Sequence, residues 1–136
     1  MKFRSDVDGF ITAIRFYKGP GNTGPHTGYI WSSTGQLLGS VTFQNETATG
    51  WQQATLPTPV PVTANTTYIV SYHAPNGHYA IDSNYFTSQV SNGVLHAPSS
   101  AASGGNGVFK YGAAGLFPDE SWQASNYWVD VVFEQP

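Results

Sequence analysis

Apolar residues occupy every second position in several short segments of this chain. In Thr67–Tyr72, for example, Tyr68, Val70 and Tyr72 alternate with other residues, which is the period of a β-strand with two different faces. No window shows a sustained apolar period of 3.6 residues, and 15 glycines and 9 prolines interrupt the chain too often for long helices. The sequence therefore predicts an all-β fold, an antiparallel β-sandwich of jelly-roll or immunoglobulin-like type.

Eight segments have the composition of strands, and turns separate them. Asp6–Gly9 has the Asp-Gly composition of a tight hairpin turn, long loops are expected after residues 73 and 112, and Ser88–Gly107 is expected to be the least structured part. The expected strands are Lys2–Ser5, Phe10–Lys18, His26–Ser33, Gln36–Phe43, Gly50–Leu56, Thr67–Tyr72, Val108–Tyr111 and Asn126–Glu134.

The alternation also predicts which side chains share a face. Trp51 is expected to be packed, with a bulge after Gly50 reversing the alternation there. In the second strand, the residues expected to share one face are Phe10, Thr12, Ile14 and Phe16. In the last strand, the residues expected to be buried are Tyr127, Val129, Val131 and Phe133.

Length and charge limit the classes of protein to consider. The chain has 136 residues, enough for one domain with a real core. Only 10% of the residues are charged and the net charge is −3, so no basic surface is expected to hold nucleic acid or an anionic membrane. There is no cysteine, which excludes disulfides and thiolate metal sites. No apolar run approaches the roughly 20 residues of a membrane span.

The N-terminus reads as the middle of a strand. Met1 is followed directly by Lys2-Phe3-Arg4, and no signal peptide precedes them. We therefore expect residues 1–136 to be a single module excised from a larger protein, and the loss of an upstream strand is an open alternative.

Polar and aromatic residues gather in the stretch that follows the strand 67–72. A loop of this kind on a rigid β scaffold is typical of a binding surface, and sugar binding in particular needs flat aromatic faces beside polar groups. The expected ligand-binding residues are His73, Asn76, His78, Tyr79, Asp82, Tyr85 and Trp122.

A sheet face is a rival binding surface. If Ile30 points inward, Tyr29 and Trp31 point outward, and Trp128 points outward from the last strand. Exposed aromatic residues on a sheet either bind a ligand or are covered. Coverage by a loop such as Gly112–Ser125 is the alternative to binding.

Metal sites are weaker possibilities. Four histidines, His26, His73, His78 and His96, lie in or beside loops and could bind zinc, copper or nickel. Hydrogen-bonded histidines that hold loops are the favoured interpretation, because no His-x-His or His-Glu-x-x-His spacing occurs. Carboxylates of Asp6 and Asp8 are candidates for a structural calcium site, although a turn explains the same residues.

Catalysis is not expected. The chain has no Gly-x-Ser-x-Gly nucleophile motif. None of its eight acidic residues stands in a recognisable catalytic motif of the kind that a glycosidase would need.

Five motifs occur together in a distinctive order: RFYKGPGNTG (15–24), GQLLGSVTF (35–43), GWQQATL (50–56), NTTYIVSYHAPNGHYA (65–80) and NYWVDVVF (126–133). In this set the chain resembles the domain of unknown function 4082 family, over nearly its whole length. The resemblance implies a β-sandwich accessory module of large secreted bacterial proteins, which often carry carbohydrate-related modules as well. It implies no functional residue, because the family has no defined activity.

The sequence as a whole favours a non-catalytic, secreted, carbohydrate-binding module. Its expected partners are a polysaccharide or cell-wall glycan and the neighbouring domains of the parent protein. A structural or adhesive spacer without a small ligand is the alternative, and a metal-dependent enzyme built on the histidines is the third reading.

Overall fold

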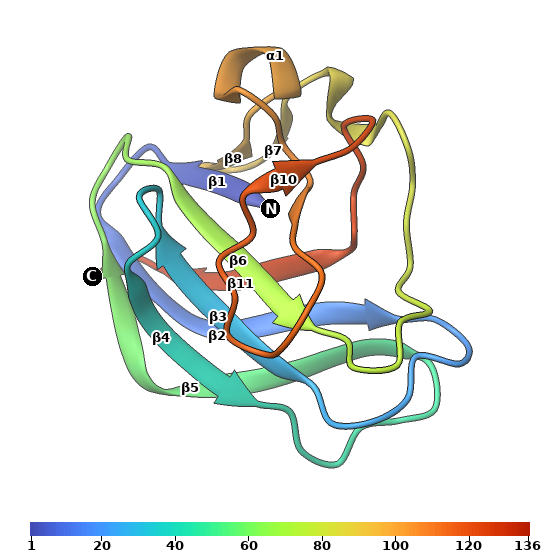
Figure 1. The fold of residues 1–136 in the computed structure, drawn as a ribbon. Helices are drawn as coiled ribbons and strands as arrows, with labels where there is room; N and C mark the ends of the chain where they lie inside the picture. Colours follow the sequence, from blue (N-terminus) through green and yellow to red (C-terminus); the bar gives the residue numbers. More distant parts are fainter.

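The alternating segments pair into two main antiparallel sheets in the computed structural model, which describes residues 1–136 (Figure 1). The larger sheet contains β1 (Lys2–Ser5), β3 (Thr27–Ser32), β4 (Leu37–Thr42), β6 (Tyr68–His73), β7 (Val90–Asn92) and β8 (Leu95–Ala97), in the order β4-β3-β6-β1-β8-β7. The smaller sheet contains β2 (Gly9–Lys18), β5 (Gly50–Val62) and β11 (Val129–Glu134), in the order β11-β2-β5.

Outside these two sheets, the chain forms only a few short elements of regular secondary structure. The strands β9 (Val108–Phe109) and β10 (Glu120–Ser121) form a separate ribbon, and the helical segments are η1 (Tyr85–Thr87) and α1 (Ser100–Ser103). None of the helical segments has the length and hydrophobicity of a membrane span. The predicted all-β antiparallel sandwich is therefore confirmed.

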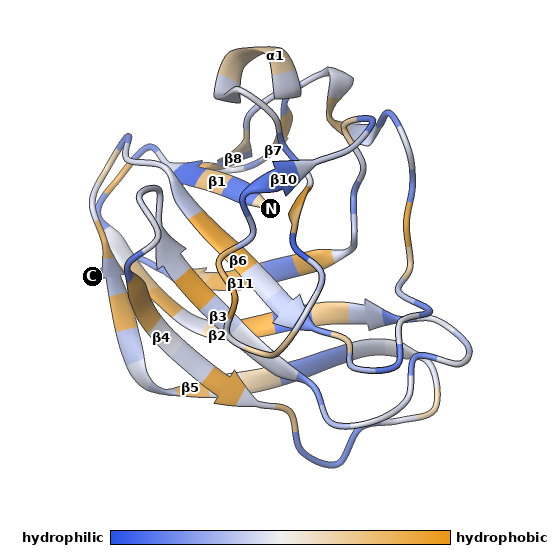
Figure 2. Cartoon of the chain, in the orientation of Figure 1, coloured by the Kyte–Doolittle hydropathy of each residue, from blue (hydrophilic) through white to orange (hydrophobic).

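The core lies between the two sheets. Figure 2 shows hydrophobic colour along the strands and hydrophilic colour over much of the loops. The innermost side chains have no exposed surface, and removing them from water is the main favourable contribution to folding. They include Ile11, Ile14 and Phe16 of the smaller sheet and Ile30 and Val70 of the larger one.

The segment between β1 and β2 crosses from one sheet to the other. β1 pairs with β6 and β8, whereas β2 pairs with β5 and β11, so the hairpin predicted at Asp6–Gly9 is wrong. The Asp8 carboxylate accepts a hydrogen bond from the Ala64 amide at 2.8 Å, and the Ser5 carbonyl accepts one from the Asn65 amide at 2.7 Å. Hydrogen bonds to the loop before β6, and not pairing with another strand, therefore hold the segment between β1 and β2 in place.

β2 changes its buried face part-way along. Ile11 and Ala13 are buried, and then Ile14 and Phe16 are buried, while Phe10 is exposed. The single face expected for positions 10 to 16 is therefore wrong in its first half. The register of β2 against β5 shifts between Ile11 and Ala13, and such a bulge reverses the alternation of side chains.

Trp51 lies on the outer face of the smaller sheet. It stands opposite Tyr17 in a regular pairing and is 43% exposed, while Gln52 and Ala54 point inward. The packed position expected for Trp51 is wrong, because the pairing with β2 is regular from Gly50 to Thr55 and no bulge follows Gly50.

The last strand follows its expected pattern in part. Val129 and Val131 are buried, whereas Tyr127 and Phe133 are half-buried. The register shifts between Val132 and Phe133, which displaces Phe133 from the alternation. The segment 88–107 is also more regular than expected, since β8 pairs with β1 and β7 with β8.

Candidate functional site

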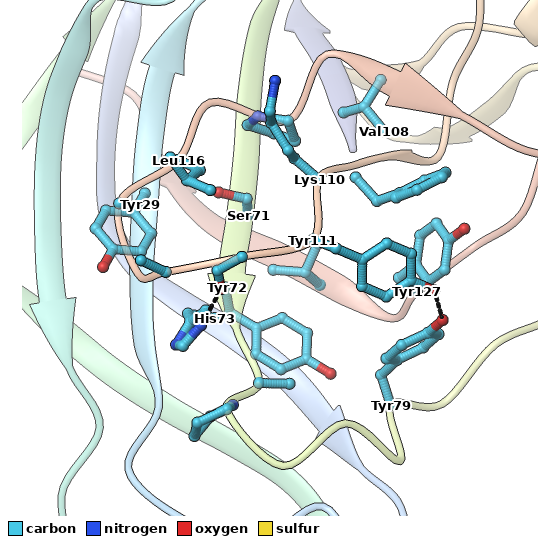
Figure 3. Close-up of a pocket in the computed structure, with 18 of the residues that line it drawn as sticks. Tyr29, Ser71, Tyr72, His73, Tyr79, Val108, Lys110, Tyr111, Leu116 and Tyr127 are labelled. Atoms are coloured by element: carbon cyan, nitrogen blue, oxygen red, sulfur yellow. Dashed lines mark hydrogen bonds between the residues drawn. The ribbon is translucent and has the colours of Figure 1, made fainter.

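A cleft of about 290 Å³ lies where the end of β6 meets the loop that follows β9 (Figure 3). This tyrosine cleft has a volume at the lower end of the range of small-molecule sites, roughly 300–1,000 Å³. Its polar and aromatic lining includes Tyr29, Ser71, Tyr72, His73, Tyr79, Phe109, Lys110, Tyr111 and Tyr127.

The outer wall of the tyrosine cleft is fastened to the sheet by hydrogen bonds. The last residue of β6, His73, donates from Nε2 to the Gly112 carbonyl at 3.0 Å. Gly112 has a φ of 135°, a conformation that glycine adopts without steric cost. Lys110 forms an ion pair with Asp119 at 3.3 Å within the same loop. The loop that forms this wall of the cleft is thereby fixed to β6.

Trp31 of β3 packs against the same loop. Its indole Nε1 donates to Ser71 Oγ at 2.9 Å, and its ring packs edge-on against Phe117 with centroids 5.5 Å apart. Trp31 is only 4% exposed. The rival open surface is therefore wrong at Trp31, and the alternative of coverage by a loop is confirmed there, because the loop 110–118 covers the ring.

The pKa values of the Tyr79 and Tyr127 hydroxyls are raised, so both remain protonated well above neutral pH. Tyr79 and Tyr111 share a hydrogen bond of 2.7 Å, marked in Figure 3, and this bond raises the pKa of Tyr79 to about 12. Burial raises the pKa of Tyr127. Neutral hydroxyls both donate and accept hydrogen bonds, so the cleft offers both functions to a ligand beside its aromatic faces.

Tyr72 is expected to make the protein sensitive to alkaline pH. Burial raises its pKa to about 12 from 10.0, although a hydrogen bond from Asn22 lowers it. Between these pH values the unfolded state has lost the proton and the folded state keeps it. Stability is therefore lost as pH rises above 10, by at most about 1.4 kcal/mol per pH unit from this group.

Urea unfolding between pH 9 and pH 12 checks this expectation against Tyr72→Phe. The variant loses the hydrogen bond with Asn22 at every pH, so the slope of stability against pH is the quantity to compare. An equally steep slope for both proteins above pH 10 would contradict the assignment.

The structure divides the predicted loop cluster. His73 and Tyr79 line the tyrosine cleft, whereas Asn76 donates to the Thr23 carbonyl at 3.1 Å and so holds the loop 19–25. His78 lies against that same loop beside Gly21. Of these four residues, two therefore line the cleft and two lie against the loop 19–25.

The remaining predicted residues lie elsewhere. Asp82 accepts a hydrogen bond from the indole of Trp128 at 2.7 Å, and Tyr85 packs against the same indole. Trp122 is 51% exposed and lines neither the tyrosine cleft nor the cleft on the other side of β11. Of the rival surface, Tyr29 joins the tyrosine cleft.

The candidate metal ligands are engaged by separate partners. Asp6 forms ion pairs with Arg4 and His96, and the hydrogen bond from His96 lowers the pKa of Asp6. Asp8 holds the Ala64 amide. No three His, Cys, Asp or Glu side chains come together in an arrangement that could hold a metal ion.

The sequence did not predict two residues that line the tyrosine cleft, Tyr111 and Tyr127. Tyr111 is 71% exposed at the start of the loop after β9, and Tyr127 was expected in the core. Tyr111 and His73 share one sequence feature: each is an aromatic residue at the end of an expected strand, directly before a long loop. That signal could have identified Tyr111.

Comparison with known proteins gives one match. The model of DUF4082, described as a domain of unknown function, matches residues 1–129. No curated protein and no solved structure matches the chain. The resemblance drawn from the sequence motifs is confirmed.

Proposed function

We propose that this chain, which belongs to the DUF4082 family, binds carbohydrate without catalysing a reaction, and that the tyrosine cleft is its glycan site. The observation that carries the proposal is the composition of this cleft, which combines five tyrosines with a volume of about 290 Å³.

The chemistry of a pyranose suits this lining. Its C–H groups pack on aromatic rings, and its hydroxyls need partners that both donate and accept hydrogen bonds. The exposed ring of Tyr111 supplies a packing surface at the rim, and the hydroxyls of Tyr79 and Tyr111 remain partly available beside it. The small volume favours one or two sugar rings, such as the end of a chain.

The proposed partners are a polysaccharide or cell-wall glycan and, in the parent protein, neighbouring domains. Such glycans lie outside the cell, so we propose that the module is extracellular. The low charge supports this choice of ligand, since 10% charged residues and a net charge of −3 offer little to polyanions.

A glycan array followed by calorimetric titration of the best-bound oligosaccharide tests the proposal. Tyr111→Ala is expected to weaken binding at least about tenfold, or ~1.4 kcal/mol, because it removes the exposed rim of the cleft. Trp122→Ala is the matched control, since it removes an exposed aromatic ring outside the cleft and is expected to leave affinity unchanged. Absence of binding across the array would favour a spacer module, and equal affinity of Tyr111→Ala and the parent would remove this cleft from consideration.

A further inference from the structure

A second cleft, of about 250 Å³, lies on the other side of β11. It opens between β11 of the smaller sheet and β1 and β8 of the larger sheet, and Val129 contributes to both clefts. We call it the tryptophan cleft, because its lining includes Trp51 and Trp128, whereas no tryptophan lines the first cleft.

A row of aromatic rings borders the tryptophan cleft on the outer face of the smaller sheet. Tyr17 contacts Trp51, Trp51 contacts Trp128, and Trp128 contacts Tyr85, with ring centroids 5.7, 6.5 and 5.2 Å apart. Tyr17, Trp51 and Tyr85 are each about 40% exposed, at 41%, 43% and 38%. Contiguous exposed apolar surface of this kind marks interaction sites.

The backbone at Trp128 is held in an unfavourable conformation. Its φ is 57°, in the left-handed region that a bulky side chain rarely adopts. The Asn126 side chain accepts a hydrogen bond from the Trp128 amide, at 2.6 Å, and Asp82 accepts one from its indole at 2.7 Å. Such conformations persist where surrounding contacts enforce them and concentrate at functional sites. Here the conformation directs Tyr127 to one cleft and Trp128 to the other.

The tryptophan cleft also holds two charged groups that do not neutralise each other. Arg15 and Asp130 are opposite in the pairing of β2 with β11 and so share a face, but they form no ion pair. The Arg15 guanidinium lies over the Trp51 ring, 4.5 Å from its centroid, and has no hydrogen-bond partner in the chain. Asp130 accepts a hydrogen bond only from the next amide, that of Val131, at 2.8 Å.

We infer that the tryptophan cleft is a second glycan site, which takes an uncharged pyranose. The guanidinium of Arg15 donates to sugar hydroxyls and the carboxylate of Asp130 accepts from them, while the ring packs on the exposed aromatic row. Asp130 disfavours an acidic sugar and Arg15 disfavours a cationic one. The inference shares the ligand class of the proposed function, but it does not depend on the tyrosine cleft.

Two sites on either side of β11 have a consequence for long ligands. A polysaccharide that reaches both sites binds the second one intramolecularly, which raises its overall affinity above that of a short oligosaccharide. Removing either site then weakens binding of the polymer more than it weakens binding of a short fragment to the remaining site.

The indole N–H signals of the four tryptophans in a ¹⁵N-labelled sample test the inference. Cellohexaose, xylohexaose and mannohexaose serve as uncharged probes, and an oligogalacturonate serves as the acidic one. At least one uncharged probe is expected to shift the signals of Trp51 and Trp128 but not that of exposed Trp122. Arg15→Gln and Trp51→Ala are each expected to weaken this binding at least tenfold, with the amide spectrum showing that the fold is kept.

Tyr111→Ala separates this inference from the proposed function. It is expected to leave the shifts of Trp51 and Trp128 unchanged, since Tyr111 lines only the tyrosine cleft. Loss of glycan binding in Tyr111→Ala alone would support only the first site. The inference is overturned if no uncharged probe shifts the Trp51 and Trp128 signals, if the oligogalacturonate binds there more tightly, or if affinity survives in both Arg15→Gln and Trp51→Ala.

Discussion

Replacing Glu46 with alanine is expected to lower the free energy of unfolding by about 3–5 kcal/mol, the usual cost of removing one partner from a buried charge pair. Glu46 forms an ion pair with Lys18 Nζ at 3.1 Å and accepts a hydrogen bond from His26 Nδ1 at 2.8 Å. The His26 ring has no exposed surface, and the side chain of Lys18 is 11% exposed. Without Glu46, both groups lose their carboxylate partner in a place that water reaches poorly.

The network around Glu46 extends to the wall of the tyrosine cleft. His26 Nε2 lies 2.8 Å from Asn22 Oδ1, and Asn22 Nδ2 donates to the Tyr72 hydroxyl at 3.3 Å. Asn22 is fully buried. Glu46→Ala is therefore expected to loosen Tyr72 as well, because groups in one hydrogen-bonded network act together.

Chemical denaturation of three proteins checks the effect of Glu46→Ala. Glu46→Gln keeps the length and an acceptor oxygen, so we expect a smaller loss, about 2 kcal/mol. Glu120→Ala is the matched control on an exposed glutamate without an ion pair, and it is expected to stay within about 0.5 kcal/mol of the parent. If Glu46→Ala lowers the free energy of unfolding no more than Glu120→Ala does, the network does not stabilise the fold.

Replacing Asn106 with alanine is the second change with a large expected effect, about 3 kcal/mol of lost stability, since each unsatisfied buried polar group costs roughly 1–3 kcal/mol. Asn106 has no exposed surface. Its Oδ1 accepts from the amides of Lys2 and Gly107 at 2.8 and 2.7 Å, and its Nδ2 donates to the carbonyls of Lys2 and Pro98 at 3.1 and 2.8 Å. One side chain thus ties β1 to the segment that follows β8.

Thermal unfolding and amide hydrogen exchange measure the effect of Asn106→Ala. The amides of Lys2 and Gly107 are expected to exchange faster, in addition to the lower melting temperature. Asn92→Ala, at an exposed position of β7, is the control and should change neither quantity. Unchanged exchange at Lys2 and Gly107 would show that other groups satisfy these amides.

The residues that line the tyrosine cleft could be found from the sequence only where a local signal existed. His73 and Tyr79 follow a clear strand, so their loop was identifiable, and both line the tyrosine cleft. Tyr111 meets Tyr79 from 32 positions further along the chain, and no local pattern encodes that meeting. Tyr85 lies in the same stretch as Tyr79, yet it lines the other cleft, because the chain crosses between the two sides of β11.

The amino-acid sequence by itself determined most of the longer strands, the all-β class and the family, because side-chain alternation and motif order are local properties. Tertiary pairing alone decided which way several side chains face. The bulge between Ile11 and Ala13 depends on the register with β5, and the burial of Trp31 depends on a loop that begins far along the chain. Both clefts arise in the same way, since each is a gap between segments that touch only after the sheets have packed against each other.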